Sequence, residues 1–331
     1  MAQGDKVKVG VYNTIQSTIA PVLGTGSGTT GYGQTVSSSQ LSSPGTSTKI
    51  TTGQWNALRN DILTCYNHQN SVNGSLTIPT LSTKVSAQLA SDYQTMATNC
   101  VTNKDNFYSG YATLSSSTQT DQAANTWGPT GSNTWKITYR LTWSNADSAR
   151  YFFNAGGQVR FNAAAATGIA DGPPTDNTTK NYAWYSTLNQ MGTIVFDNYS
   201  TYTLAGAYSP GTGSSYGYSN TQSLGTGNLL YTKLTSTYTP NAYRIYLDPG
   251  ASSLTFYVEF EDLSVSANQT VYTYDPYGQS FGPYGVDEFI TVQCSNYIKL
   301  YYASGTGQVD VSSYLPTVSV LSSQVIASPS P

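Results

Sequence analysis

Charged side chains are scarce in this sequence. Of its 331 residues only 9% are Asp, Glu, Lys or Arg, and the net charge is −3; ordinary soluble domains carry roughly 25% charged residues. The 14 basic residues are scattered, so there is no basic stripe of the kind that binds nucleic acid by releasing counterions. Apolar runs of roughly 18 residues or more are also missing. We therefore expect no nucleic-acid partner and no membrane span.

Side chains that commonly carry chemistry are few as well. His68 is the single histidine, and the three cysteines are far apart in the sequence. A zinc site needs several such ligands together, and a Ser-His-Asp site would need His68 beside a G-x-S-x-G elbow that is absent. Glu259 and Glu261 are two residues apart in an alternating segment, which favours a solvated sheet face over a catalytic pair. We predict that the chain is not an enzyme and holds no cofactor or metal.

Hydroxyl and aromatic residues dominate instead. Ser and Thr together number 88, and tyrosines number 28. Because Thr and Tyr fit pleated, half-buried surfaces, this composition predicts a folded chain that is mainly β.

The N-terminal third contains an arm and two helices. Alternation at Val7, Val9 and Val11 predicts a short strand, followed by a Gly/Ser/Thr-rich tract over 24–53. Thr51 and Gln54 have capping-box spacing, and Trp55, Leu58, Ile62 and Tyr66 follow at helical steps. A second helix is predicted over 83–107, with Val85, Leu89, Met96 and Cys100 on one stripe. We therefore assign 1–53 to an extended strand and arm, and 54–117 to a helical pair.

The period then changes from helical to two. Trp135, Ile137, Tyr139, Leu141 and Trp143 alternate with polar residues, which predicts a strand buried on one face. A short helix over 144–153 is predicted to end at a structural turn formed by Asn154, Gly156 and Gly157.

The same alternation continues towards the C-terminus. A hairpin is predicted around Asp248-Pro249-Gly250, a helix over 178–190, and strands over 193–196, 289–292, 296–302 and 308–311. We predict that 118–315 is an antiparallel β-sandwich, with which a jelly-roll-like order is compatible, and that 316–331 is a C-terminal tail.

Two loops rich in Tyr and Gly, YSPGTGSSYGYSN and DPYGQSFGPYGVDE, are candidate contact surfaces, since Tyr offers a large contact area at low entropic cost. They either contact a protein partner or stack on glycan, or they are ordinary loops that pack on their own sandwich. The candidate contact residues are Tyr208, Tyr216, Tyr218, Tyr277, Phe281 and Tyr284.

Three stretches are similar to a known class of proteins. ITTGQWNALRNDILTCYNHQ, SNADSARYFFNAGGQVRFNAA and SLTFYVEFED resemble motifs of virion structural proteins of tailed bacteriophages, of the cyanophage and marine-phage type. The most specific match is ARYFFNAGGQVRF at 149–161. The resemblance implies a neck, tail or fibre-associated component of the virion, made in the host cytoplasm, and no catalytic residues. It also implies that the helical pair over 54–117 docks on the virion.

Two functions remain open from the sequence. One is a non-enzymatic structural component whose partners are copies of itself and other virion proteins. The alternative is a module that binds a receptor or host surface glycan through its Tyr/Gly-rich loops. Because the tract over 24–53 is too polar to order itself, we expect a homo-oligomer with inter-chain contacts from residues 1–53.

Overall fold

The computed structural model describes residues 8–42, 49–70, 72–79, 85–108, 112–122, 127, 133–165, 179–204, 209–236, 238–264, 269–274, 280–286, 290, 292–305 and 308–327. The chain forms two compact units. The helical unit comprises Met1–Ser115, Trp143–Gln158 and Tyr301–Pro316, and the sandwich unit comprises Ser116–Thr142, Val159–Leu300 and Thr317–Pro331. A division at residue 118 was therefore too simple, because two segments expected in the sandwich, Trp143–Gln158 and 301–315, belong to the helical unit.

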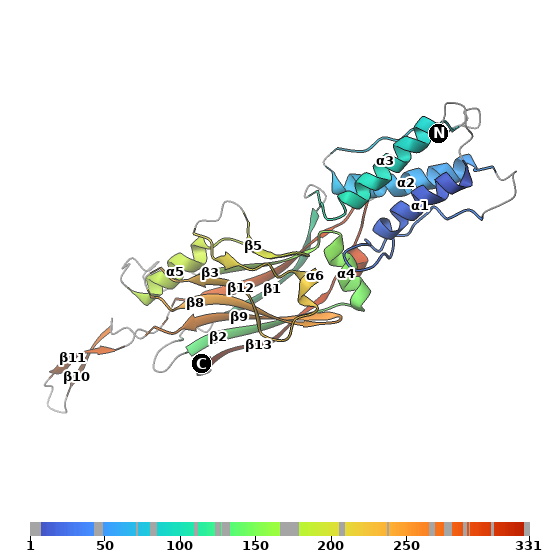
Figure 1. Ribbon diagram of the computed structural model, residues 1–331. Coiled ribbons are helices and arrows are strands. Elements are labelled where there is room, and N and C mark those ends of the chain that lie inside the picture. The colour runs from blue at the N-terminus through green and yellow to red at the C-terminus, as the bar shows by residue number, and fades with distance from the viewer. Residues whose placement is uncertain are drawn as a thin grey trace. The chain divides into compact units, whose positions relative to one another are not determined.

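In the part of the helical unit that the structure describes there are three long helices and two short ones, and Figure 1 labels α1 to α4. As predicted, a capping box starts the second long helix: Gln54 N donates to Thr51 Oγ1 (3.2 Å) and Thr51 N donates to Gln54 Oε1 (2.7 Å). These bonds satisfy amides that the first helical turn leaves without partners. The helices are α1 (Val9–Leu23), α2 (Thr52–Gln69), α3 (Ala87–Thr102), α4 (Ala146–Asn154) and the 3-10 helix η2 (Ser312–Tyr314).

The expected strand at the N-terminus is wrong, because residues from Val9 onward form helix α1. Its buried side chains Tyr12, Ile15 and Ile19 recur at helical steps, a signal that extends further than the alternation of three valines. Tyr12 contacts Trp55 of α2 edge to face, with ring centroids 5.4 Å apart. Trp55 contacts Tyr93 of α3 in the same manner at 5.1 Å, so one aromatic row joins the three helices.

The face of α3 differs from the prediction. Cys100 is buried as expected, but Leu89 and Met96 are only half-buried. The other buried residues are Ala90, Tyr93 and Ala97. At two positions the buried residue is the alanine that follows the predicted one, Ala90 in place of Leu89 and Ala97 in place of Met96, because small side chains let the helices approach closely.

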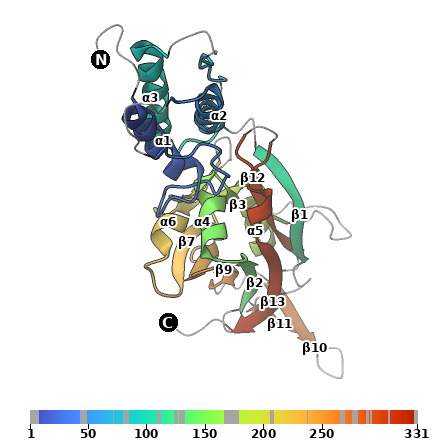
Figure 2. The same cartoon turned by 90° about the vertical axis from the view of Figure 1, so that its right-hand side faces the viewer.

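The sandwich unit contains two main sheets, as predicted (Figure 2). One has the strand order β13-β2-β9-β8-β7-β6, the other β1-β12-β3-β4-β5, and every pair with a described register is antiparallel. Strands β6 to β9 follow one another as a meander, extended by β2 and β13, which is not the double Greek key of a jelly roll. The strands are β1 (Ala112–Gln122), β2 (Asn133–Thr142), β3 (Gln158–Ala165), β4 (Ile194–Phe196), β5 (Thr201–Thr203), β6 (Thr212–Gly213), β7 (Asn228–Leu234), β8 (Ala242–Gly250), β9 (Ser253–Asp262), β12 (Cys294–Ala303) and β13 (Thr317–Ala327).

Three further elements complete this unit. The predicted helix over 178–190 is α5 (Lys180–Gln190), and α6 (Tyr218–Thr221) is a single turn. A separate two-stranded sheet pairs β10 (Gln269–Tyr274) with β11 (Ser280–Val286).

The core of the sandwich follows the alternation of β2. All five predicted residues from Trp135 to Trp143 are buried, and Arg140 is exposed. Thr138 was expected to be exposed but is also buried, because β13 lies beside it and Ser322 Oγ is 2.9 Å from Thr138 Oγ1.

Aromatic and polar contacts join the two sheets. The ring of Phe256 on β9 lies 5.1 Å from that of Phe161 and 5.3 Å from that of Phe196, both of the opposite sheet. In the middle of the core, Asn296 Nδ2 on β12 donates to Tyr243 Oη on β8 (2.8 Å). The buried amide nitrogen thus finds its acceptor on the opposite sheet.

Several strand boundaries differ from the prediction. Pro249 and Gly250 pair with Leu254 and Ser253, so the β8–β9 hairpin turns at residues 251–252, after the Asp-Pro-Gly sequence. Of residues 289–292, Ile290 forms only an isolated bridge with Trp127. Residues 308–311 form no strand, and 317–327, expected to be a tail, form strand β13.

Candidate interaction site at a sheet edge

Strand β13 forms one edge of the six-stranded sheet (Figure 1). It pairs along its whole length with β2, from Thr317 opposite Thr142 to Ala327 opposite Asn133. Among the described strands it has no partner on its other side. Its sequence, TVSVLSSQVIA, contains neither charge nor proline.

Apolar side chains of β13 are open to solvent. Val320, Leu321 and Val325 are 38%, 55% and 41% exposed. The two valines pair with Tyr139 and Trp135, whose side chains face the core, so both valines lie on the core side at the rim of the sandwich. Leu321 is the extra residue of a bulge between Val320 and Ser322. The edge therefore combines unpaired backbone with an uncovered apolar rim.

Ion pairs lie on the outer face of this sheet. Lys136 Nζ lies 2.7 Å from Glu259 Oε1 and 4.4 Å from the centre of the Tyr257 ring. Arg244 forms an ion pair with Glu261, whose side chain is 9% exposed. The expectation of a solvated pair of glutamates is thus wrong for Glu261, which is buried.

The predicted Tyr/Gly contact residues do not form one described surface. Tyr208 and Tyr277 lie outside the described residues, as do the side chains of Phe281 and Tyr284 on β11. Tyr216 is half-buried. A further member of the predicted set, Tyr218, starts α6 and is 7% exposed, so it packs in the protein and was wrongly predicted as a contact residue.

The predicted turn after α4 is present and is structural. Gly156 has φ +81°, and a Cβ there would overlap the ring of Phe107; Gly157 follows with an ordinary φ. Asn154 is buried, and its Nδ2 donates to the carbonyl oxygens of Gly28 (3.2 Å) and Gly31 (3.3 Å). The turn therefore holds part of the glycine-rich tract.

The tract over 24–53 finds its partners within its own chain. Arg150 donates to the carbonyl oxygens of Thr25 and Thr30, each at 2.7 Å. Asp61 accepts hydrogen bonds from the backbone N–H groups of Ser37 (3.0 Å) and Ser38 (2.7 Å). The argument that only another chain could order this tract is therefore wrong for its described part, since α2 and α4 already supply the hydrogen bonds.

His68 is a buried packing residue. Its ring lies 4.9 Å from that of Tyr32 and 5.5 Å from that of Phe107. Burial lowers its pKa from 6.5 to about 3, so the imidazole is neutral near pH 7. Its Nε2 has no hydrogen-bond partner among the described residues, which fits a packing role.

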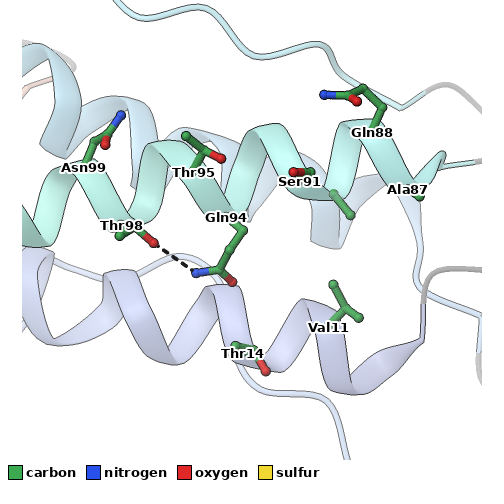
Figure 3. A pocket seen from close by; sticks show the side chains of 10 residues that line it. Val11, Thr14, Ala87, Gln88, Ser91, Gln94, Thr95, Thr98 and Asn99 are labelled. Carbon is green, nitrogen blue, oxygen red and sulfur yellow. Dashed lines mark hydrogen bonds between the residues drawn. The ribbon is translucent and has the colours of Figure 1, made fainter. Parts of the chain in front are cut away.

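An open groove lies between α1 and α3 (Figure 3). Val11 and Thr14 line it from α1, and α3 contributes small and amide side chains, with Gln94 donating to Thr98 Oγ1 at 3.3 Å. None of its described lining residues is ionisable, so the groove offers no acid or base.

Comparisons with protein-family models, with curated proteins and with solved structures find no match to this chain. None of the described helices combines the length and the apolar character needed to cross a membrane.

Proposed function

We propose that this protein is a non-enzymatic structural component of a tailed-phage virion that assembles by pairing the exposed edge of β13 with the same strand of a second copy. The edge supports assembly. The virion context and the neck, tail or fibre position rest on the resemblance of the segments around 50–69 and 144–164.

An edge of this kind is unusual in a monomer. Natural sheets protect their edges with charged residues, proline, strong bulges or covering segments, because unpaired backbone groups accept a strand from another chain. β13 is 11 residues long, carries no charge, and exposes Leu321 and Val325. After its single bulge it runs regularly from Ser322 to Ala327, a length typical of a whole strand.

A second copy fits this edge better than an unrelated strand does. In a twofold arrangement β13 pairs antiparallel with itself, and like charges directly opposite each other would oppose that pairing. The uncharged strand has none. The rim valines, Val320 and Val325, lie on one side of the sheet, so those of the second copy meet them on that same side.

The test is the oligomeric state of the full chain. Multi-angle light scattering and sedimentation should show a concentration-dependent dimer that the double variant Leu321→Lys, Val325→Lys converts to monomer without unfolding it. Leu229→Lys is the matched control, because Leu229 is 41% exposed on β7 of the same sheet, away from β13; it should leave the dimer intact. A wild-type chain that stays monomeric at every concentration, or a double variant that dimerises like the control, contradicts the proposal.

The virion context needs its own measurement. Proteins from purified phage particles of the producing genome would be identified by mass spectrometry, and the chain should be present in multiple copies. Its absence from the particles would refute the virion assignment while leaving the edge pairing standing.

A further inference from the structure

Three polar side chains meet in the dry interior of the sandwich unit. Lys180 begins α5, Asn241 precedes β8, and Asp262 ends β9. Lys180 and Asn241 are 0% exposed and Asp262 is 4% exposed. Burying an amine, an amide and a carboxylate costs free energy unless each is bonded, so the contacts among them decide what the cluster can do.

One carboxylate joins the amine to the amide. Lys180 Nζ lies 3.1 Å from each oxygen of Asp262, and Asn241 Nδ2 donates to Oδ1 of the same carboxylate at 2.7 Å. Both nitrogens therefore contact the same oxygen, Asp262 Oδ1. The distance between the two nitrogens cannot exceed the sum of these two contact distances. A carboxylate in this position can take a proton from one nitrogen and deliver it to the other.

The carbonyl of the amide is held by two backbone donors. Asn241 Oδ1 accepts hydrogen bonds from the N–H groups of Leu263 and Ser264, each at 2.7 Å. Paired N–H groups aimed at a carbonyl oxygen stabilise the negative charge that develops there when a nucleophile adds to the carbon. Lys180 Nζ also donates to Ser264 O at 2.6 Å, so the same short segment positions both reaction partners.

Each member of this cluster has an aromatic residue two to four positions away in the sequence. Trp184 lies one turn after the lysine on α5, Phe260 two residues before the aspartate, and Tyr243 two residues after the asparagine. The ring of Phe260 is 5.9 Å from that of Trp184 and 5.0 Å from that of Tyr243. Because the three polar residues are themselves buried, water is kept away from them, which favours formation of an amide over its hydrolysis.

We propose that Lys180 and Asn241 form an intramolecular isopeptide bond, with Asp262 as the proton carrier. Asp262 takes a proton from the ammonium group, and the neutral Nζ adds to Cγ of Asn241 while Oδ1 receives the negative charge. Asp262 then transfers a proton from Nζ to Nδ2. The Cγ–Nδ2 bond breaks, one molecule of ammonia leaves with its electron pair, and the Nζ–Cγ amide remains. No oxidant, metal or nucleotide is needed, and the overall charge is conserved because the released ammonia takes up the remaining proton.

The mass of the full chain tests this directly. Under denaturing conditions the purified wild-type protein should be lighter than its sequence by the mass of one ammonia molecule. Digestion should yield a branched peptide that joins Lys180 to Asn241, and trypsin should not cleave after Lys180. Lys180→Arg and Asp262→Asn should both restore the full sequence mass, and Asn241→Asp should lose one water in place of one ammonia.

A matched control separates this chemistry from ordinary ion pairing. Lys136→Arg removes a lysine that also contacts a carboxylate, that of Glu259, on the outer face of the sheet, and it should keep the mass deficit. An unmodified wild-type mass would overturn the proposal and make the cluster a structural ion pair. Loss of one water with a branch at Asp262, or a deficit that maps elsewhere in the chain, would overturn it as well. Because the wild-type mass is decisive by itself, a variant that fails to fold does not obscure the result.

Discussion

Acid should destabilise the helical unit through His68. Burial holds the pKa of its imidazole near 3 in the folded protein, against an ordinary value of 6.5. Between these two pH values the imidazole of His68 is protonated in the unfolded chain and neutral in the folded chain. The stabilisation is therefore fully present above the unfolded pKa and falls as the pH drops below it. Since each pKa unit corresponds to about 1.4 kcal/mol, lowering the pH to about 5 should cost roughly 2 kcal/mol from this residue.

The neighbours of His68 do not titrate in the same range. Burial raises the pKa of Tyr32 and of Cys65 well above their ordinary values, so both stay protonated throughout. Carboxylates elsewhere also lose stabilising contacts in acid. The contribution of His68 to the loss of stability is therefore measured as the difference between the wild type and a variant that lacks the imidazole. His68→Phe keeps an aromatic ring between Tyr32 and Phe107 but removes the titrating group.

Urea unfolding followed by circular dichroism at about pH 7 and about pH 5 gives the comparison. The wild type should lose about 2 kcal/mol more unfolding free energy than His68→Phe over this interval. Equal losses in the two proteins would show that His68 is hydrated or paired in the folded state, and the argument from burial would fail.

Two further changes test the packing. Phe256→Ala removes the ring that contacts both Phe161 and Phe196 across the two sheets, and should lower the free energy of unfolding by about 3–5 kcal/mol in urea titrations; a cost below about 1 kcal/mol would mean that the sheets do not pack as described. Gly156→Ala should cost about 1–3 kcal/mol because its φ is +81° and Phe107 occupies the position of the new methyl group, whereas Gly10→Ala, which meets no atom within 4 Å, should not destabilise the protein. Equal melting temperatures for the two alanine variants would contradict the assigned turn.

Local patterns in the sequence predicted the elements whose determinants are local. The capping box at Thr51, the alternation from Trp135 to Trp143 and the glycine turn at Gly156 each involve residues within ten positions of one another, and each is present in the structure. Strand β13 was missed although Val318 and Val320 alternate with polar residues. An edge strand buries little, so its hydrophobic pattern is weak, and a Ser-rich segment near the chain end resembles a tail.

The partner contacts of the glycine-rich tract could not be predicted. Arg150 and Asp61 are far from Thr25 and Ser38 in the sequence, and only folding brings them together. The same limitation hid the three-residue cluster around Asp262, whose members come from α5 and from the adjacent ends of β8 and β9. Each member looks ordinary in its own segment, and the chemistry exists only in their combination.

The edge and the buried cluster belong to the same sheet. β13 pairs with β2, β2 pairs with β9, and β9 ends at Asp262, beside the residue that precedes β8. A strand added at β13 would pass load through hydrogen-bonded ladders to β9 and β8, where non-covalent contacts, among them the Lys180–Asp262 ion pair and the packing of Trp184 on Phe260, hold the sheet against α5. A covalent bond between Lys180 and Asn241 would reinforce these contacts with a link that does not break when the strands are pulled past one another. Such a bond also limits the unfolded chain by closing the loop from α5 to β8, as a disulfide does in an oxidising compartment. A subunit built this way would need no disulfide, which agrees with three buried cysteines that remain unpaired.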